Sequence, residues 1–219
     1  MAKIKKKQIV TALLECHGRT FAQELGIELK RNTPAPLFRL LCLSLLTSAP
    51  LSADAAMQAC MALGKAGWTT PTKMASSTWE ERVRVLNENG YARYDEKTAR
   101  QLEALTDHLQ EAYAGDLRQL REQADGDIKK ARRLLKEFKG IGGVGADIFL
   151  REAQLCWDEF RPFADKMALK SSAKLKLGDD AETLAKRVDS NDFARLVAAL
   201  VRTQLAKDHD RVLEVAAAS

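Results

Sequence analysis

Apolar residues recur at helical intervals along most of the chain. Over residues 8–29 this period predicts one helix, broken near Gly18. Residues 37–47 are apolar on nearly all sides, which predicts a central, buried helix. Ser52 or Asp54 should cap the helix that follows and ends at Gly64. Further helices are predicted over 74–86, 95–113, 116–124, 128–138, 146–157, 166–177, 180–188 and 192–205. The sequence contains no strand pattern, so the predicted fold class is all-α.

A cluster of glycines separates the predicted helices over 128–138 and 146–157. It consists of Gly140, Gly142, Gly143 and Gly145. Glycine allows a sharp turn and leaves the backbone amides accessible. The next helix begins at these amides, where its free N–H groups and the positive end of its dipole attract anions, most often phosphate. A purely structural turn between two helices is the alternative interpretation.

The same glycines fit a second motif. Gly140-x-Gly142-x-x-Gly145 matches the dinucleotide-binding fingerprint, which requires an apolar strand before its first glycine. The preceding residues are lysines, arginines and glutamates among leucines, so the pattern disfavours a dinucleotide site.

Composition adds a modest positive charge. The chain has 219 residues and a net charge of +5, which agrees with a phosphate-bearing partner and equally with a solvated basic surface. The four cysteines, Cys16, Cys42, Cys60 and Cys156, lack zinc-site spacing and are expected to be reduced thiols. No metal site is expected.

The sequence predicts a cytoplasmic protein without a membrane span. The apolar run 37–46 is too short for a span and contains Arg39. The basic start, residues 1–7, is not followed by the apolar region of a signal peptide.

Three motifs together resemble the endonuclease III-like DNA glycosylases. Ile141-Gly-Gly-Val-Gly-Ala-Asp147 is similar to the helix-hairpin-helix signature of that family. Eighteen positions after Asp147, where the family has its catalytic aspartate, stands Asp165 within Pro162-Phe-Ala-Asp-Lys166. Leu45-Leu-Thr-Ser-Ala49 is similar to an early loop of the family. The resemblance implies two helical lobes: a helical barrel over 33–158 that ends in the hairpin, and a second lobe made of 1–32 and 159–219.

The resemblance also implies the site residues. Asp165 would be catalytic, and Asp147 and Lys166 would lie at the pocket. The residues expected to contact DNA are Gly142, Gly143, Val144, Gly145 and Ala146 of the hairpin, Ser48, Pro50 and Leu51 of the early loop, Arg93 and Tyr94 before a helix, and Lys170. Some of these residues have a structural alternative: Asp165 as a helix cap, Leu51 as a staple on its helix, Arg93 and Tyr94 as packing, and Lys170 as a solvated lysine.

The chain departs from the family at three points. Asp147 replaces the Schiff-base lysine, so lyase chemistry is not expected. The chain has no cysteine after Cys156, so the iron–sulfur cluster of many relatives is not expected either. Phe149 stands where the family has a small residue. A monovalent cation held by backbone carbonyls of the hairpin is the one cofactor that the resemblance implies.

The expected function is that of a monofunctional DNA glycosylase of base excision repair. A carboxylate such as Asp165 can stabilise the positive charge that develops on the sugar and can orient water, while the target base leaves the stack. The expected partner is double-stranded DNA with a damaged or mismatched base, bound by a monomer in the cytoplasm at the nucleoid. The alternatives are a non-catalytic lesion sensor and a glycosylase with lyase activity from Lys166 or Lys139.

Overall fold

The computed structural model describes residues 4–218, and these form helices and turns without a strand. The predicted all-α class is therefore confirmed. Residues 1–3 and 219, part of the predicted terminal lobe and of the basic start, lie outside the described residues. The chain divides into two compact units. Unit 2 is Leu25–Phe160, and unit 1 joins the residues up to Glu24 to those from Arg161 on, whereas the predicted borders stood at 33 and 158.

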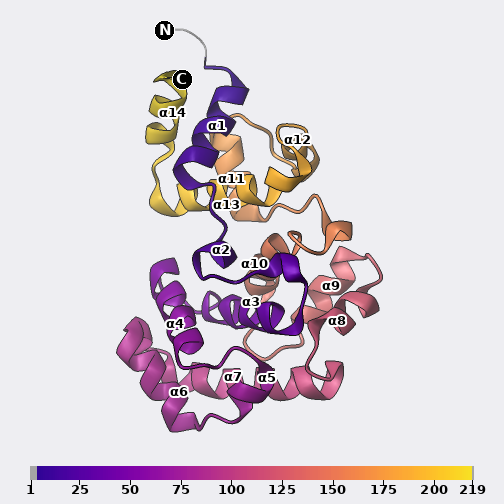
Figure 1. The fold of residues 1–219 in the computed structure, drawn as a ribbon. Helices are drawn as coiled ribbons and strands as arrows, with labels where there is room; N and C mark the ends of the chain where they lie inside the picture. The colour runs from indigo at the N-terminus through magenta and orange to yellow at the C-terminus, as the bar shows by residue number, and fades with distance from the viewer. Residues whose placement is uncertain (1–3, 219) are drawn as a thin grey trace. The chain divides into compact units, whose positions relative to one another are not determined.

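Unit 2 is built around one buried helix, α3 (Pro34–Leu46). Helix α3 contacts α4, α7, α8 and α10, and Figure 1 shows it in the middle of the unit. The prediction of a central buried helix is thus confirmed, because an apolar surface on all sides needs neighbours on all sides. The other elements of unit 2 are η1 (Leu29–Arg31), α4 (Ala53–Lys65), α5 (Pro71–Ala75), α6 (Trp79–Leu86), η2 (Asn87–Tyr91), α7 (Asp95–Tyr113), α8 (Leu117–Ala124), α9 (Ile128–Leu135), α10 (Gly143–Ala153) and η3 (Asp158–Phe160).

Side-chain caps set the starts of several helices in unit 2. Ser52 caps α4, as predicted, by accepting a hydrogen bond of 3.2 Å from the Ala55 amide. The single helix predicted over 74–86 is wrong, because α5 ends at Ala75 and Thr78 begins a new helix, α6. Its hydroxyl accepts from the Glu81 amide at 3.2 Å, and the Glu81 carboxylate accepts from the Thr78 amide at 2.8 Å. This capping box splits the segment into α5 and α6.

Unit 1 brings the two ends of the described chain together. It contains α1 (Lys6–His17), α2 (Phe21–Glu24), α11 (Lys166–Lys174), α12 (Ala181–Ala185), α13 (Ser190–Ala206) and α14 (His209–Ala218). Helix α1 packs against α13 and α14 (Figure 1). The predicted break at Gly18 is confirmed, and the Gly18 carbonyl accepts a hydrogen bond of 2.9 Å from Arg195 Nε. His17 Nε2 lies 2.8 Å from Asp208 Oδ2, which fastens the end of α1 to the start of α14.

All four cysteines are free, with Cys42 and Cys60 buried and Cys16 and Cys156 partly exposed. Burial raises the pKa of the Cys60 thiol to about 12. Within residues 4–218, no helix is both long and apolar enough to cross a membrane.

Candidate functional site

The glycine cluster forms a hairpin between α9 and α10. Gly140 has φ +95°, a conformation that favours glycine, and the Ile141 amide donates to the Phe138 carbonyl at 3.0 Å to close the turn. Helix α10 begins at Gly143, three residues before the predicted start. Gly143 and Gly145 therefore belong to its first turn rather than to the loop.

The first turn of α10 presents backbone amides without a side-chain cap. Its N-cap residue is Gly142, which has no side chain to accept from the amides of Gly143, Val144 and Gly145. The Val144 side chain beside them is 65% exposed. Ala146 differs from these residues, because its side chain is buried and its amide donates to the Gly142 carbonyl at 3.0 Å.

Gly145 lets α10 lie directly against the end of α3. A Cβ at this position would be 2.3 Å from Ser48 Oγ and 3.0 Å from the Ser44 carbonyl oxygen. Ser48 in turn donates to the Ser44 carbonyl at 2.7 Å. The absence of a side chain at Gly145 thus serves close helix packing, and it brings the predicted loop at Ser48, Pro50 and Leu51 next to the hairpin.

The turn that carries Arg93 and Tyr94 is attached to the same end of α3. The buried Tyr91 hydroxyl donates to the Leu46 carbonyl at 2.7 Å. Its burial raises the pKa of Tyr91 to about 12. The Arg93 guanidinium lies over the Tyr94 ring, 5.6 Å from the centroid. Tyr94 is the N-cap residue of α7. Three predicted DNA-binding segments therefore meet around the C-terminal end of α3.

Asp147 is paired across the hairpin. Arg132, on α9, donates from Nε to Asp147 Oδ1 at 2.5 Å and from its terminal nitrogen to Oδ2 at 3.2 Å. The same guanidinium group also reaches the Gly143 carbonyl at 3.3 Å. This hydrogen bonding raises the pKa of Arg132, so the arginine stays charged. The sequence analysis missed Arg132, because nothing in the spacing distinguishes it from the neighbouring basic residues.

Asp165 is the N-cap residue of α11 in unit 1. Its Oδ1 accepts hydrogen bonds of 2.9 Å from the amides of both Met167 and Ala168, and only 8% of the residue is exposed. The structural role considered for this residue is therefore observed. Lys166 and Lys170 are exposed on the helix that it caps.

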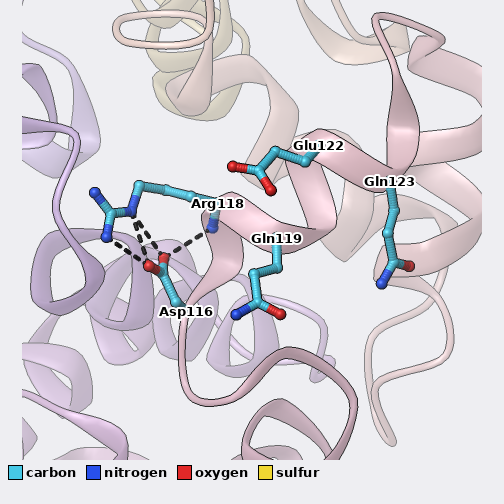
Figure 2. A pocket seen from close by; sticks show the side chains of 5 residues that line it. All are labelled: Asp116, Arg118, Gln119, Glu122 and Gln123. Atoms are coloured by element: carbon cyan, nitrogen blue, oxygen red, sulfur yellow. Dashed lines mark hydrogen bonds and ion pairs between the residues drawn. The ribbon is translucent and has the colours of Figure 1, made fainter.

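An open polar hollow of about 510 Å³ lies over α8. Figure 2 shows its five lining residues, Asp116, Arg118, Gln119, Glu122 and Gln123. Asp116 caps α8 and binds the guanidinium of Arg118 through Oδ2 at 2.6 Å. None of the predicted site residues lines this hollow. The hydrogen bonds among its lining residues are those between Asp116 and Arg118.

The chain is similar to a structure described as a trapped endonuclease III–DNA covalent intermediate, an estranged-adenine complex. The match has a TM-score of 0.49 at 18% sequence identity and covers 92% of this chain and 86% of that chain. No protein-family model matches the chain, and no curated protein matches its sequence.

Proposed function

We propose that the protein is a monofunctional DNA glycosylase, which hydrolyses the N-glycosidic bond of a damaged or mismatched base in double-stranded DNA. The observation that carries the proposal is the uncapped first turn of α10, next to two other segments that present polar and aromatic groups. In this proposal the protein acts on DNA as a monomer in the cytoplasm, at the nucleoid.

The hairpin binds the DNA backbone in this proposal. The amides of Gly143, Val144 and Gly145 hold one backbone phosphate, since they are unpaired donors at the positive end of a helix dipole. Pro50 and Leu51 follow Ser48 in the loop beside the hairpin. Exposed Pro50 or half-buried Leu51 fills the gap that a displaced base leaves in the stack, as apolar wedges do in other DNA-bending proteins.

Asp165 supplies the charge for the chemical step. Breaking the N-glycosidic bond develops positive charge on the sugar, and a fixed carboxylate stabilises that charge and orients the attacking water. Two amide hydrogen bonds to Oδ1 fix this carboxylate in place. A preorganised group needs no reorientation at the moment of reaction, which is why such groups are effective. The step uses water and a side chain and needs no cofactor.

Lyase chemistry is not part of the proposed activity. A Schiff base needs an amine at the sugar, and Asp147 offers a carboxylate in its place. The bidentate contact with Arg132 also holds this carboxylate within the hairpin. Lys139 and Lys166 are the exposed amines that a lyase alternative would have to use.

A second candidate function follows from the geometry of Asp165. Its Oδ1 is already committed to capping α11, as expected of a purely structural residue. A lesion-sensing protein would use the same hairpin and loop and would perform no chemistry.

One assay separates these functions. The protein is incubated with a panel of duplex oligonucleotides, each with one modified or mismatched base, and the products are analysed with and without alkali. Strand cleavage only after alkali is expected for the proposed glycosylase. Cleavage without alkali would identify a lyase, and preferential binding of a lesion without any product would identify a sensor.

A further inference from the structure

One short segment carries a net charge as large as that of the whole chain. Residues 128–139, which comprise α9 and the start of the hairpin turn, contain six of the 35 basic residues and one of the 30 acidic residues. The remainder of the chain therefore holds 29 of each kind and is neutral. The six residues are Lys129, Lys130, Arg132, Arg133, Lys136 and Lys139. We refer to them as the basic face.

Helical geometry collects three of these charges on one side. With about 100° per residue, Lys129, Arg133 and Lys136 fall within a narrow arc opposite the residues that α9 buries. Ala131 and Leu135 lie on that buried side, and both are fully shielded from solvent. Lys129, Arg133, Lys136 and Lys139 are exposed. The arrangement presents a row of cations to solvent.

The cations of the basic face have few internal partners. Only Arg132 forms an ion pair with a described residue, Asp147. The acidic residue nearest to the start of α9, Asp127, uses its carboxylate to cap the helix through the amides of Lys129 and Lys130, at 2.8 and 3.2 Å. A charge cluster that serves stability would be expected to alternate in sign, as i,i+4 pairs do. Here like charges are kept together and unpaired, which indicates an external polyanion.

The basic face is continuous with the hairpin. Arg132 contacts the Gly143 carbonyl in the first turn of α10, Lys136 ends α9, and Lys139 lies in the turn that leads to Gly142. A row of cations that leads up to a cluster of free amides has the chemistry of a track for successive phosphates of one strand.

We propose that the basic face of α9 binds the phosphate backbone of duplex DNA that flanks the hairpin and supplies most of the salt-dependent binding free energy. This inference rests on the proposed function for its partner, DNA, and not for its chemistry. The contacts are to phosphates, so they are independent of base sequence.

The test compares two triple variants with the same change in net charge. The first, Lys129→Gln, Arg133→Gln and Lys136→Gln, removes three cations from the basic face. The matched control, Lys65→Gln, Lys73→Gln and Lys186→Gln, removes three exposed lysines from α4, α5 and the end of α12. Affinity for an undamaged duplex is measured at several salt concentrations, and thermal melting verifies the fold of each variant.

The basic-face variant should bind on the order of tenfold to a hundredfold more weakly near 0.1 M salt, because each lost phosphate contact lowers the slope of log K against log salt by about 0.9. The control should stay within about twofold of the wild type, since distant charges are screened. Equal losses in the two variants, or an unchanged salt slope in a folded basic-face variant, would overturn the proposal. If the triple variant melts at a clearly lower temperature than the wild type, the single variants Arg133→Gln and Lys136→Gln replace it. Each should change the slope of log K against log salt by about one.

Failure of this inference is distinguishable from failure of the proposed function. If the wild type releases a base and the two triple variants bind DNA equally well, the proposal for the basic face is wrong and the glycosylase proposal stands. If the wild type binds DNA through the basic face but releases no base from any duplex of the panel, the glycosylase proposal is wrong and the proposal for the basic face stands.

Discussion

Arg132 and Asp147 face each other across the hairpin, with Nε of the arginine 2.5 Å from Oδ1 of the aspartate. They come from consecutive helices, α9 and α10, and are 15 positions apart. The pair neutralises an acid that lies one turn from the amides proposed to hold a phosphate. The pair therefore reduces the repulsion that the Asp147 carboxylate would otherwise exert on DNA phosphates.

Charge removal at this pair should change DNA affinity in a defined order. Asp147→Asn frees the guanidinium and should bind DNA more tightly than the wild type. Arg132→Gln leaves the carboxylate uncompensated and should bind most weakly, and the double variant should fall near the wild type. Fluorescence anisotropy at two salt concentrations provides the measurement. An Arg132→Gln variant that bound as well as the wild type would show that the pair lies away from DNA.

The same variants should change stability little. Arg132 is 41% exposed, and pairs of this kind contribute about 0–1 kcal/mol. Thermal melting should therefore shift by no more than about 4 °C for a chain of this length. A larger loss would mean that Arg132 mainly fixes the hairpin, through the Gly143 carbonyl as well as Asp147.

Gly142 allows the phosphate site to be tested without disturbing the core. Its φ is −87°, which any residue adopts, and a Cβ there meets nothing within 4 Å. Gly142→Asp should cap the first-turn amides and place a negative charge where the phosphate would lie, so DNA affinity should fall sharply. Gly142→Asn is the matched control, because it caps equally well without the charge and should lose less affinity. Both should melt at or slightly above the wild-type temperature. Equal affinity in all three proteins would remove the hairpin from the interface.

Gly145→Ala should act on stability first. Its Cβ would lie 2.3 Å from Ser48 Oγ and 3.0 Å from a backbone oxygen of α3. Overpacking of this kind costs about 1–3 kcal/mol. We expect a lower melting temperature together with weaker DNA binding, because the hairpin and the loop at Ser48 move apart. Melting and binding curves for Gly145→Ala and Gly142→Ala, compared directly, would show this difference, and equal melting temperatures would contradict it.

Asp165→Asn should abolish base release and preserve the fold. Asparagine caps helices as well as aspartate, so the hydrogen bonds to Met167 and Ala168 can persist. Loss of one preorganised electrostatic group lowers the rate by about 10²–10³, and loss of general-base help adds to this. Single-turnover base release, DNA affinity and melting temperature are the measurements.

A matched control makes the Asp165 experiment specific. Asp180 is also an N-cap aspartate of unit 1, and its Oδ1 accepts from the Thr183 amide at 2.7 Å. Asp180→Asn is the same chemical change outside the proposed site and should leave base release unchanged. If Asp165→Asn released base at nearly the wild-type rate, its role would be that of a cap, and Asp147 would be the next carboxylate to test.

Borohydride should trap no covalent adduct with DNA. A carboxylate at position 147 cannot form the Schiff base that reduction would capture. Incubation with an abasic duplex and sodium borohydride, followed by denaturing electrophoresis, provides the test. A trapped band would contradict the monofunctional assignment. Peptide mapping, with Lys166→Ala and Lys139→Ala variants, would then identify the amine.

Local patterns in the sequence determined the fold class and most helix positions. The period of apolar residues located α3, and α7 has the predicted bounds of 95 and 113, because burying one helix face leaves a direct trace in the sequence. The caps at Ser52 and Asp116 and the break at Gly18 depend on nearby residues only. The split at Thr78 was equally local, since Thr78-x-x-Glu81 is a capping-box pattern, and the helical period on both sides obscured it.

Only the tertiary structure decided how the parts of the candidate site are arranged. Gly145 and Ser48 are 97 positions apart, and their contact depends on how α10 crosses α3. Tyr91 reaches Leu46 across 45 positions. The partner of Asp147 could not be selected from six nearby basic residues without the angle of the hairpin. The start of α10 at Gly143 also required the fold, because packing on α3 stabilises a glycine-rich turn of helix that local propensity disfavours. Contacts between distant segments depend on how the helices cross one another, and the local sequence pattern contains no information about these crossings.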